Sequence, residues 1–419
     1  MYAHFIANLI IFLGAINIIR MVFFMVGSDC YSLKNALNRK SLREDFELPT
    51  FTVVIPAHNE GISILHSVKS VVNANYPKNK LQLIVVDDGS SDDTYAIVDR
   101  YRAENKINLW LIHQENAGKA HALNNGLRNY AVGELVMCLD ADSTIAPEAL
   151  RKAAWHFRDS RVVALSSNVK IRPTGTLFNL IQIFEYIVCY QMKRASSLFN
   201  IEYIIGGIGS TFRHSTLKKV GYYDTDTITE DIDLTMKLLQ LGNKEHRVIY
   251  GADVITYTES VLDMSGLIRQ RFRWKYGRAQ TFVKNASLFF SKSNRQNKGL
   301  TWFYLPYALF SDLAFFFEPF MVSYIGYIIF RYGDWVTFLS AFAVIGTYIS
   351  MNVLAEDTLP LKQKLKLVAI APSMYFFFYA LTFVEYMALI KTYVKFQEIP
   401  KSIDQEKCSW EHVARAEVA

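Results

Sequence analysis

The chain has 419 residues, of which 51% are hydrophobic and 20% charged, with a formal net charge of +6. This length allows one catalytic domain of roughly 200–250 residues plus accessory segments. The modest positive charge suits lipid headgroups or diphosphates and is not that of a nucleic-acid-binding tail, so no nucleic-acid partner is expected. No CxxC pair occurs, which excludes the usual zinc and disulfide patterns for the four cysteines Cys30, Cys138, Cys189 and Cys408.

The N-terminal segment is strongly apolar. Residues 3–26 are long enough to cross a hydrocarbon core of ~30 Å as a helix. Basic residues follow at once, and by the positive-inside rule they place the next domain in the cytosol; they are Lys34, Arg39, Lys40 and Arg43. The sequence therefore predicts a transmembrane helix over 1–28 and a basic cytosolic linker over 29–50.

Short β-rich runs alternate with helical patterns after residue 50. The predicted strands are 51–56, 81–86, 108–113 and 135–139. The predicted helices between them reach about residue 72, cover 93–104 and cover 119–130. This alternation predicts an α/β fold with a doubly wound parallel sheet, in which ligands bind beyond the carboxyl ends of the strands.

Acidic residues follow two of these strands, at the edge where ligands are expected. Asp140 and Asp142 flank one residue after the fourth strand, a pattern that suits a divalent ion bridging a diphosphate. The alternative is that they form a turn with an Asx cap. Asp87 and Asp88 could likewise be residues that form a turn. Lys119 begins a predicted helix. One interpretation is that it binds a phosphate there, and the other is that it is a solvated surface lysine.

The segment 177–193 is apolar but too short to span a membrane comfortably, and Gln182 and Glu185 interrupt it. We expect an amphipathic helix on the membrane surface, with a buried core helix as the alternative. Downstream, Thr229 has the position of an N-cap for a helix whose first turn is acidic, and capping alone accounts for the motif. The functional alternative is a general base that deprotonates an acceptor hydroxyl.

Gln270, Arg273 and Trp274 are spaced i, i+3, i+4 and so share one face of a helix. An amide, a guanidinium and a large ring make a poor core but suit a diphosphate and a stacked sugar. Other basic residues on this helix are explained equally well by contact with anionic headgroups; they are Arg269, Arg271, Lys275 and Arg278.

The C-terminal third contains three more apolar segments, at about 302–330, 335–354 and 367–390. The first is long for one span and contains Pro319, which predicts a kink or a split. We therefore expect transmembrane helices over 301–392, about four in the whole chain, and a tail over 393–419. Counting spans places the C-terminus outside, whereas the basic residues of the tail indicate the opposite side; they are Lys391, Lys395, Lys401 and Lys407.

Three acids lie inside these apolar runs, namely Asp312, Glu318 and Glu385. Intramembrane acids are costly and often functional. They line a path for a sugar chain, lie near the interface, or pair with a neighbouring helix, and the sequence leaves all three readings open.

The motifs taken in order resemble the signature of the processive family 2 glycosyltransferases, which include cellulose, chitin and hyaluronan synthases. The matching motifs are PAHNE (56–60), DDGSSDDT (87–94), GKAHALN (118–124), DAD (140–142), TED (229–231) and QRFRW (270–274). The match covers about 51–290. Residues 169–186 and 220–238, with one leading and three trailing helices, are most similar to the bacterial poly-β-1,6-N-acetylglucosamine synthases.

The resemblance implies a GT-A-type domain with a nucleotide-sugar-binding half over 51–175 and an acceptor half with interfacial helices over 176–290. It assigns Glu60 and Asp88 to the uracil and ribose, and places His58 where the family often has an aromatic residue beside the base. The remaining implied roles are Lys119, Gln270 and Arg273 at the diphosphate, Asp140 at the nucleotide and the metal, Asp142 at the Mg²⁺ or Mn²⁺ ion, Asp231 as catalytic base, and Glu230 and Trp274 at the acceptor.

The implied activity is inverting transfer from a UDP-sugar, with UDP-N-acetylglucosamine as the leading donor, into a growing β-linked polysaccharide. The implied location is the plasma membrane. The protein would cross the lipid bilayer several times, with its catalytic domain in the cytosol. Accessory export subunits or small membrane subunits are compatible with the resemblance alone. The alternatives are a non-processive family 2 enzyme making a glycolipid or lipid-linked sugar, a transporter, and an inactive scaffold subunit.

Overall fold

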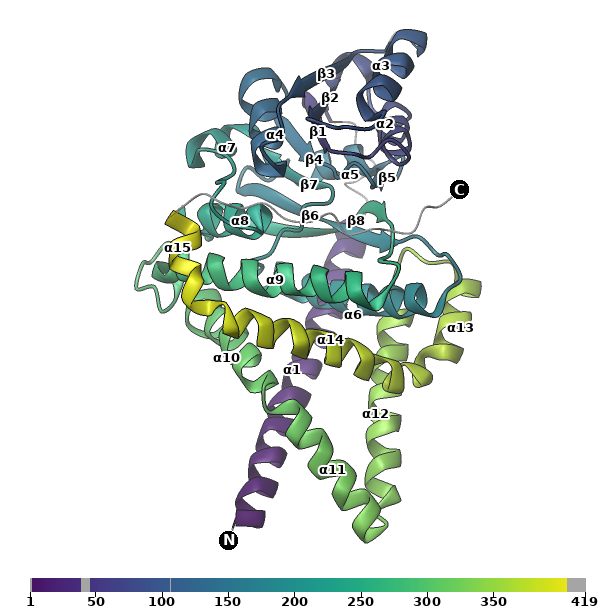
Figure 1. Cartoon of the computed structure of the whole chain (residues 1–419), viewed down its shortest axis with the longest axis vertical. Helices are drawn as coiled ribbons and strands as arrows, with labels where there is room; N and C mark the ends of the chain where they lie inside the picture. Colours follow the sequence, from purple (N-terminus) through teal and green to yellow (C-terminus); the bar gives the residue numbers. More distant parts are fainter. Residues whose placement is uncertain (1, 39–45, 106, 405–419) are drawn as a thin grey trace.

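The structure is a computed structural model that describes residues 2–38, 46–105 and 107–404. An α/β domain forms one end of the molecule, three helices run across beneath it, and further helices project away from it (Figure 1). Some basic residues and one cysteine discussed above lie outside the described residues; they are Arg39, Lys40, Arg43, Lys407 and Cys408.

The first half of the domain is the predicted parallel sheet. Its strands are β1 (Phe51–Ala57), β2 (Leu81–Asp88), β3 (Leu109–Gln114) and β4 (Leu135–Cys138). The neighbours β3–β2, β2–β1 and β1–β4 are all parallel. The intervening helices are α2 (Ile64–Val72), α3 (Thr94–Asn105) and α4 (Lys119–Asn125), the last continued by a π-helical turn over Gly126–Tyr130. The predicted strands and helices are thus confirmed to within one or two residues, apart from the π turn that ends the last helix.

The second half makes the sheet mixed, which corrects the prediction of a purely parallel one. It adds β5 (Thr144–Ile145), β6 (Val162–Ile171), β7 (Ser210–Arg213) and β8 (Arg247–Thr258) in the order β3-β2-β1-β4-β7-β6-β8-β5. Strand β7 is antiparallel to β4 and β6, and β5 is antiparallel to β8. The helices of this half are α5 (Ala149–His156), α7 (His214–Val220) and α8 (Glu230–Gln240).

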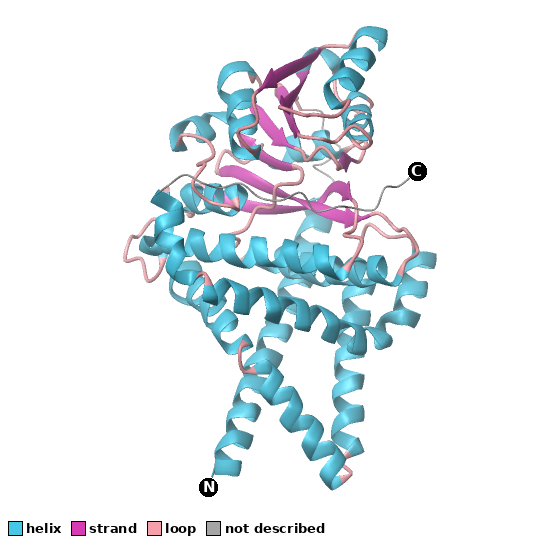
Figure 2. Cartoon of the chain, viewed as in Figure 1, coloured by secondary structure: helices cyan, strands magenta, loops and turns pink. Residues whose placement is uncertain are grey.

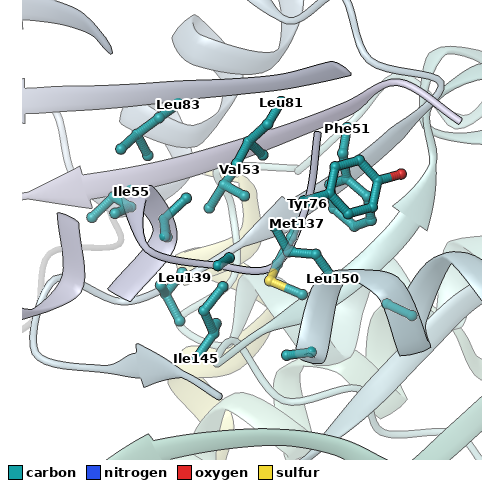
Figure 3. Close-up of a cluster of buried hydrophobic side chains, with 14 of the residues drawn as sticks. Phe51, Val53, Ile55, Tyr76, Leu81, Leu83, Met137, Leu139, Ile145 and Leu150 are labelled. Carbon is teal, nitrogen blue, oxygen red and sulfur yellow. The ribbon is translucent and has the colours of Figure 1, made fainter. Parts of the chain in front are cut away.

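Both faces of the sheet are buried, as expected for a doubly wound fold. On one face Phe51, Val53 and Ile55 of β1 pack with Met137 and Leu150 (Figure 3). The alternate residue Val54 points to the other face, where it packs among side chains of α4, α7 and α8. This two-sided core fixes the strands, so the residues after their carboxyl ends are held at one edge.

Helices α6 (Leu177–Leu198), α9 (Met264–Lys284) and α14 (Met374–Val394) run across beneath the sheet (Figures 1 and 2). Side chains of α6 and α9 share a hydrophobic cluster with α12, α13 and α14. Helix α6 buries Ile181, Phe184 and Ile187 and even the polar Gln182 and Gln191. Helix α6 is therefore packed against other parts of the chain, which favours the alternative of a buried helix over an amphipathic helix on the membrane surface.

The projecting helices are α1 (Tyr2–Asn38), α11 (Glu318–Tyr332) and α12 (Trp335–Leu354) (Figure 1). Helix α10 (Leu305–Phe315) follows a π turn and leads into α11 through a bend of 56°. Pro319 lies in the first turn of α11, where a missing N–H is tolerated but a continuous helix is not. The predicted split of this segment is confirmed.

Two helices in the described part of the chain are long and apolar enough to cross a membrane, Gly14–Leu37 and Leu361–Val394. The bent pair α10–α11 makes a third if it is one span, and Phe338–Leu354 is a shorter apolar helix. The expectation of about four spans is therefore not confirmed.

Helix α14 has a direction that hydropathy alone does not reveal. It follows α13 (Leu361–Ile370) and runs along α9, crosswise to α1 and α12 (Figure 1). Helix α15 (Ile399–Asp404) then contacts α9, where the Gln280 side-chain amide donates to Ser402 Oγ at 2.8 Å. Residues 399–404 therefore lie beside α9, an arrangement that favours the side indicated by the basic residues of the tail.

Arg194 joins the α/β domain to the helices below it. Its side chain is 1% exposed and donates to Ser32 Oγ of α1 at 2.9 Å and to Asp357 after α12 at 3.1 Å. Replacing Arg194 with Met removes these hydrogen bonds to a charged group, whereas Asp357 is half-exposed and the nearby Glu356 keeps Lys170, so the free energy of unfolding is expected to fall by about 1.5–3 kcal/mol. Thermal unfolding of the detergent-solubilised chain measures this loss.

Arg161→Met is the matched control, because Arg161 pairs with Asp159 at the surface with 60% of its side chain exposed. Its loss is expected to cost about 0–1 kcal/mol. Equal melting temperatures for the two variants would contradict the role given to Arg194.

Candidate active site

A cluster of opposite charges lies at the carboxyl edge of the sheet. Lys119, the first residue of α4, places its Nζ 2.7 Å from Asp140 Oδ1 and 3.2 Å from Glu230 Oε1. Burial disfavours the charged lysine, but the carboxylates of Asp140 and Glu230 outweigh it and raise the pKa of Lys119. The sheet edge and the first turn of α8 therefore meet through one ammonium group.

Asp231 follows Glu230 in the first turn of α8 and belongs to the same cluster. Burial first, and then the charge of Glu230, raise the pKa of Asp231 to about 6, although Lys119 and Arg273 act in the opposite direction. Its Oδ1 accepts a hydrogen bond from the Ile232 N–H at 2.8 Å. A carboxylate with a pKa near 6 is suited to accept a proton near neutral pH.

Gly207 forms one wall of this cluster. A Cβ at Gly207 would lie 2.9 Å from Lys119 Nζ, 3.7 Å from Asp231 Oδ2 and 3.8 Å from Asp140 Oδ1. The structure brings Gly207 to the charged groups, where the absence of a side chain leaves them accessible.

Asp88 shapes the loop that leads to Lys119. Its carboxylate accepts hydrogen bonds from Gln114 Nε2 at 2.7 Å, the Ala117 N–H at 3.0 Å and the Gly118 N–H at 2.8 Å. Gly89 lies beside this loop with a φ of +68°, and a Cβ there would be 2.7 Å from the Asn116 backbone nitrogen. The Asp-Gly pair is thus a tight turn, as one reading expected, and the Asp88 side chain also fixes the neighbouring loop.

His58 and Glu60 lie on the adjoining loop after β1. His58 Nδ1 is 2.8 Å from the Asp88 carbonyl oxygen, and its ring also contacts the Asn116 side chain at 3.2 Å. Glu60 Oε2 accepts a hydrogen bond from Ser63 Oγ at 2.6 Å. These residues line the β1–β2 part of the edge, next to the loop that ends at Lys119.

Asp87 has a histidine partner that none of the sequence motifs includes. The Asp87 side chain is fully buried, and its Oδ2 lies 2.6 Å from Nδ1 of His113 at the end of β3. Within the described residues, the other carboxylate oxygen of Asp87 is buried without a hydrogen-bond partner. Asp87 therefore does more than form a turn. The parallel pairing of β2 with β3 could have indicated this contact, because it places Asp87 opposite His113.

Asp140 and Asp142 form the candidate metal site. Asp142 Oδ1 accepts a hydrogen bond from Ser143 Oγ at 2.9 Å, and Asp140 already lies against the Lys119 ammonium. Carboxylate oxygens are the ligands that Mg²⁺ and Mn²⁺ prefer, and this position demonstrably attracts positive charge. The donor set therefore fits a divalent ion.

A second acidic group has a different role. Asp224, Asp226 and Asp233 place carboxylate oxygens within 4.8 Å of one another. Lys284 Nζ lies 2.7, 2.6 and 2.8 Å from these three carboxylates, so an ammonium already occupies the position between them. This arrangement ties the segment before α8 to the end of α9, and no spacing in the sequence indicated it.

Thr229 stands at the N-cap position of α8, but its side chain makes no capping hydrogen bond. It packs instead against α9, where a Cβ on Gly277 would lie 2.5 Å from Thr229 Oγ1. The expectation that capping explains the motif is therefore wrong for the Thr229 side chain. The close approach brings the first turn of α8 onto α9.

The residues Gln270, Arg273 and Trp274 lie on α9 as predicted. Gln270 is buried, and Arg273 and Trp274 are partly buried. The effect of Arg273 on the pKa of Asp231 places its guanidinium within electrostatic range of the cluster. One face of the Trp274 ring is covered by the guanidinium of Arg271, 4.2 Å from the ring centroid.

The other cations of α9 pair with acids of neighbouring helices. Arg271 and Lys275 both contact Glu385 of α14, and Lys275 and Arg278 both contact Asp312 of α10. Contact with lipid headgroups is therefore the wrong reading for these three cations, while Arg269 is exposed. Of the readings open for the intramembrane acids, pairing with a neighbouring helix describes Asp312 and Glu385.

Comparisons with known proteins agree with this geometry. Residues 52–221 match the family model described as glycosyl transferase family 2. The poly-β-1,6-N-acetyl-D-glucosamine synthase of Staphylococcus aureus is 31% identical over 278 residues, which cover 64% of this chain and 65% of the relative. The synthase of the same description from Staphylococcus epidermidis is 29% identical over 347 residues, covering 79% of this chain and 80% of the relative.

Among solved structures, a mannosyltransferase of Pyrobaculum calidifontis in complex with GDP-Man and Mn²⁺ is similar with a TM-score of 0.53 and 22% identity. The similarity covers 90% of this chain and 96% of that one. At this identity it supports the fold alone. Residues 52–221 are therefore similar to the domain of the family 2 glycosyl transferases.

Proposed function

We propose that the chain is a membrane glycosyltransferase that adds sugars from a UDP-sugar to a growing β-linked polysaccharide by inverting transfer. The observation that carries this proposal is the cluster of Lys119, Asp140, Glu230 and Asp231 at the ligand-binding edge of the sheet. It combines a cation for a diphosphate, carboxylates for a metal and a carboxylate with a raised pKa.

The nucleotide would lie along the carboxyl ends of β1 and β2. His58, Glu60 and Asp88 line this part of the edge, and the loop fixed by Asp88 ends at Lys119. The uracil and ribose are therefore assigned to the side of His58 and Glu60, and the diphosphate to Lys119. Arg273 and Gln270 of α9 would approach the diphosphate from the opposite side, since Arg273 is close enough to affect Asp231.

Asp140 and Asp142 would hold a Mg²⁺ or Mn²⁺ ion, which when bound supplies positive charge against the diphosphate oxygens. The Lys119 ammonium, now paired with Asp140, would turn toward the same oxygens. Fixed positive charges stabilise a departing diphosphate better than water does, because they need no reorganisation.

Asp231 would act as general base. Its carboxylate accepts the proton of an acceptor hydroxyl, whose oxygen attacks the anomeric carbon of an α-linked donor. The bond from that carbon to the diphosphate oxygen breaks, and UDP leaves with the electron pair. Attack from the face opposite the leaving group gives a β-glycosidic bond. Glu230 and Trp274 would hold the acceptor, Trp274 by stacking.

The polymer and the donor sugar are inferred from the relatives. Both Staphylococcus synthases carry poly-β-1,6-N-acetyl-D-glucosamine in their names, so UDP-N-acetylglucosamine is the proposed donor. The chain spans 65% of the length of the first of these relatives. The apolar helices α1, α11 and α12 support a membrane location, with the catalytic domain in the cytosol and the polymer passing into a path beside these helices.

Asp231→Asn tests the assignment of the base. The amide cannot accept the proton, so polymer formation is expected to fall by about 10²–10⁴-fold. UDP binding in the presence of Mn²⁺, measured by calorimetry, is expected to stay close to that of the parent. Asp226→Asn is the matched control on the same segment and is expected to keep turnover, because Lys284 retains Asp224 and Asp233. Parental polymer yield from Asp231→Asn would remove Asp231 from this role.

The pH dependence of kcat/KM reports the same group. Because Asp231 must be deprotonated to act and its pKa is about 6, activity is expected to decline as the pH falls through 6. Glu230→Gln removes a like charge that raises this pKa, so the acidic limb is expected to move to lower pH. A limb that stays in place in Glu230→Gln would show that another group controls it.

A further inference from the structure

Helix α9 carries a row of cations that is separate from the candidate site residues Gln270, Arg273 and Trp274. Arg271, Lys275 and Arg278 are spaced i, i+4, i+7, which places them along one stripe of the helix. All three side chains are largely buried, with exposed fractions of 3%, 16% and 19%. Charges buried to this degree need partners, so what they contact determines how α9 is held.

Acids from three other helices alternate with these cations. Arg271 lies 2.7 Å from Glu185 of α6 and 3.3 Å from Glu385 of α14. Lys275 lies 3.0 Å from Glu385 and 3.0 Å from Asp312 of α10. Arg278 forms an ion pair with Asp312 as well. Three cations and three carboxylates thus balance in one network that joins α6, α10 and α14 to α9.

One end of this network reaches a residue of the candidate acceptor site. The Arg271 guanidinium lies over the Trp274 ring, 4.2 Å from its centroid. A guanidinium in this position attracts the electron-rich face of an indole. Glu185 accepts a hydrogen bond from Arg271 at 2.7 Å, and Glu385 adds an ionic contact with Arg271 Nε at 3.3 Å, so carboxylates of two different helices hold the guanidinium at the ring.

We propose that Glu385, together with Glu185, is a positioning residue that holds Trp274 ready for the acceptor sugar by fixing Arg271. The inference rests on the proposed function for its ligand, a terminal sugar of the growing chain. Glu385 touches no reacting atom and acts on the ring through Arg271, while its second contact, with Lys275, ties α14 to α9. The position of α14 along α9 thus becomes part of the acceptor site.

Glu385→Gln is the direct test, since the amide keeps the shape of the side chain and removes its charge. Arg271 then retains one carboxylate, and its contact with the ring is loosened. The KM for an oligosaccharide acceptor is expected to rise about threefold to tenfold, the size of one partly buried cation–π contact. The KM for the UDP-sugar is expected to stay unchanged, and the polymer to become shorter. Glu385→Asp, which keeps the charge, is expected to lie closer to the parent.

Asp312→Asn is the matched control. It removes a carboxylate from the same network, but its partners are Lys275 and Arg278, whereas the cation over the Trp274 ring is Arg271. Its stability is expected to fall, while the acceptor KM stays at the parental value. An acceptor KM that rises equally in both variants would reduce Glu385 to a general structural role and overturn the proposal.

A spectroscopic readout separates this inference from the proposed function. The chain has six tryptophans, so Trp274 emission is obtained as the difference between each protein and its Trp274→Phe counterpart. Acrylamide quenching of this emission in the detergent-solubilised full chain is expected to increase in Glu385→Gln and not in Asp312→Asn. Unchanged quenching in Glu385→Gln overturns the positioning. Increased quenching in a chain that polymerises no UDP-sugar supports the positioning and rejects the proposed function.

Discussion

The contact between the Lys119 ammonium and the carboxylates of Asp140 and Glu230 is the interaction on which the site depends. Three carboxylates, including that of Asp231, are gathered in a largely buried place where their mutual repulsion would be costly. The ammonium offsets this cost and draws the end of β4, the start of α4 and the start of α8 together. The same balance of charges leaves Asp231 with a raised pKa.

The rest of the fold serves to bring these elements to one place. The two-sided core holds the parallel strands β1, β2 and β4, so their following loops lie along one edge. The close approach of Thr229 to Gly277 and the Lys284 ion pairs then hold α8 against α9. Helix α9 is in turn held from below by the acids of α6, α10 and α14. The catalytic edge and the membrane-proximal helices are therefore connected through α9.

Much of this arrangement follows from local sequence patterns. The strands before Asp87 and Asp140 are short apolar runs ended by polar residues, and parallel pairing necessarily brings their ends together. The spacing of Gln270, Arg273 and Trp274 likewise fixes a shared helix face. What the sequence does not display are contacts between distant segments. The contact of Lys284 with its three aspartates depends on the packing of α8 against α9, and that of Lys119 with Glu230 depends on how α4 and α8 are placed; no periodicity encodes either.

The membrane region shows the same limit of local patterns. Hydropathy identifies α14 as apolar but does not reveal its direction. The observed direction, along α9, agrees with the ion pairs that Glu385 forms with Lys275 and Arg271. Asp312 and Glu385 are unusual as acids within apolar runs, and the sequence does not reveal that their cationic partners lie on α9. Thr229 illustrates the converse error, because a residue type suited to capping packs against a glycine instead.

The central claim is that this chain polymerises a sugar from a UDP-sugar into a β-linked product. The most direct measurement incubates the full chain in lipid nanodiscs, with Mg²⁺ or Mn²⁺, with individually labelled UDP-sugars, and digests the product with linkage-specific hydrolases. The account predicts label from UDP-N-acetylglucosamine in a large product that a hydrolase specific for β-linked N-acetylglucosamine degrades. Label confined to a small glycolipid, or a product resistant to every β-specific hydrolase, would contradict it.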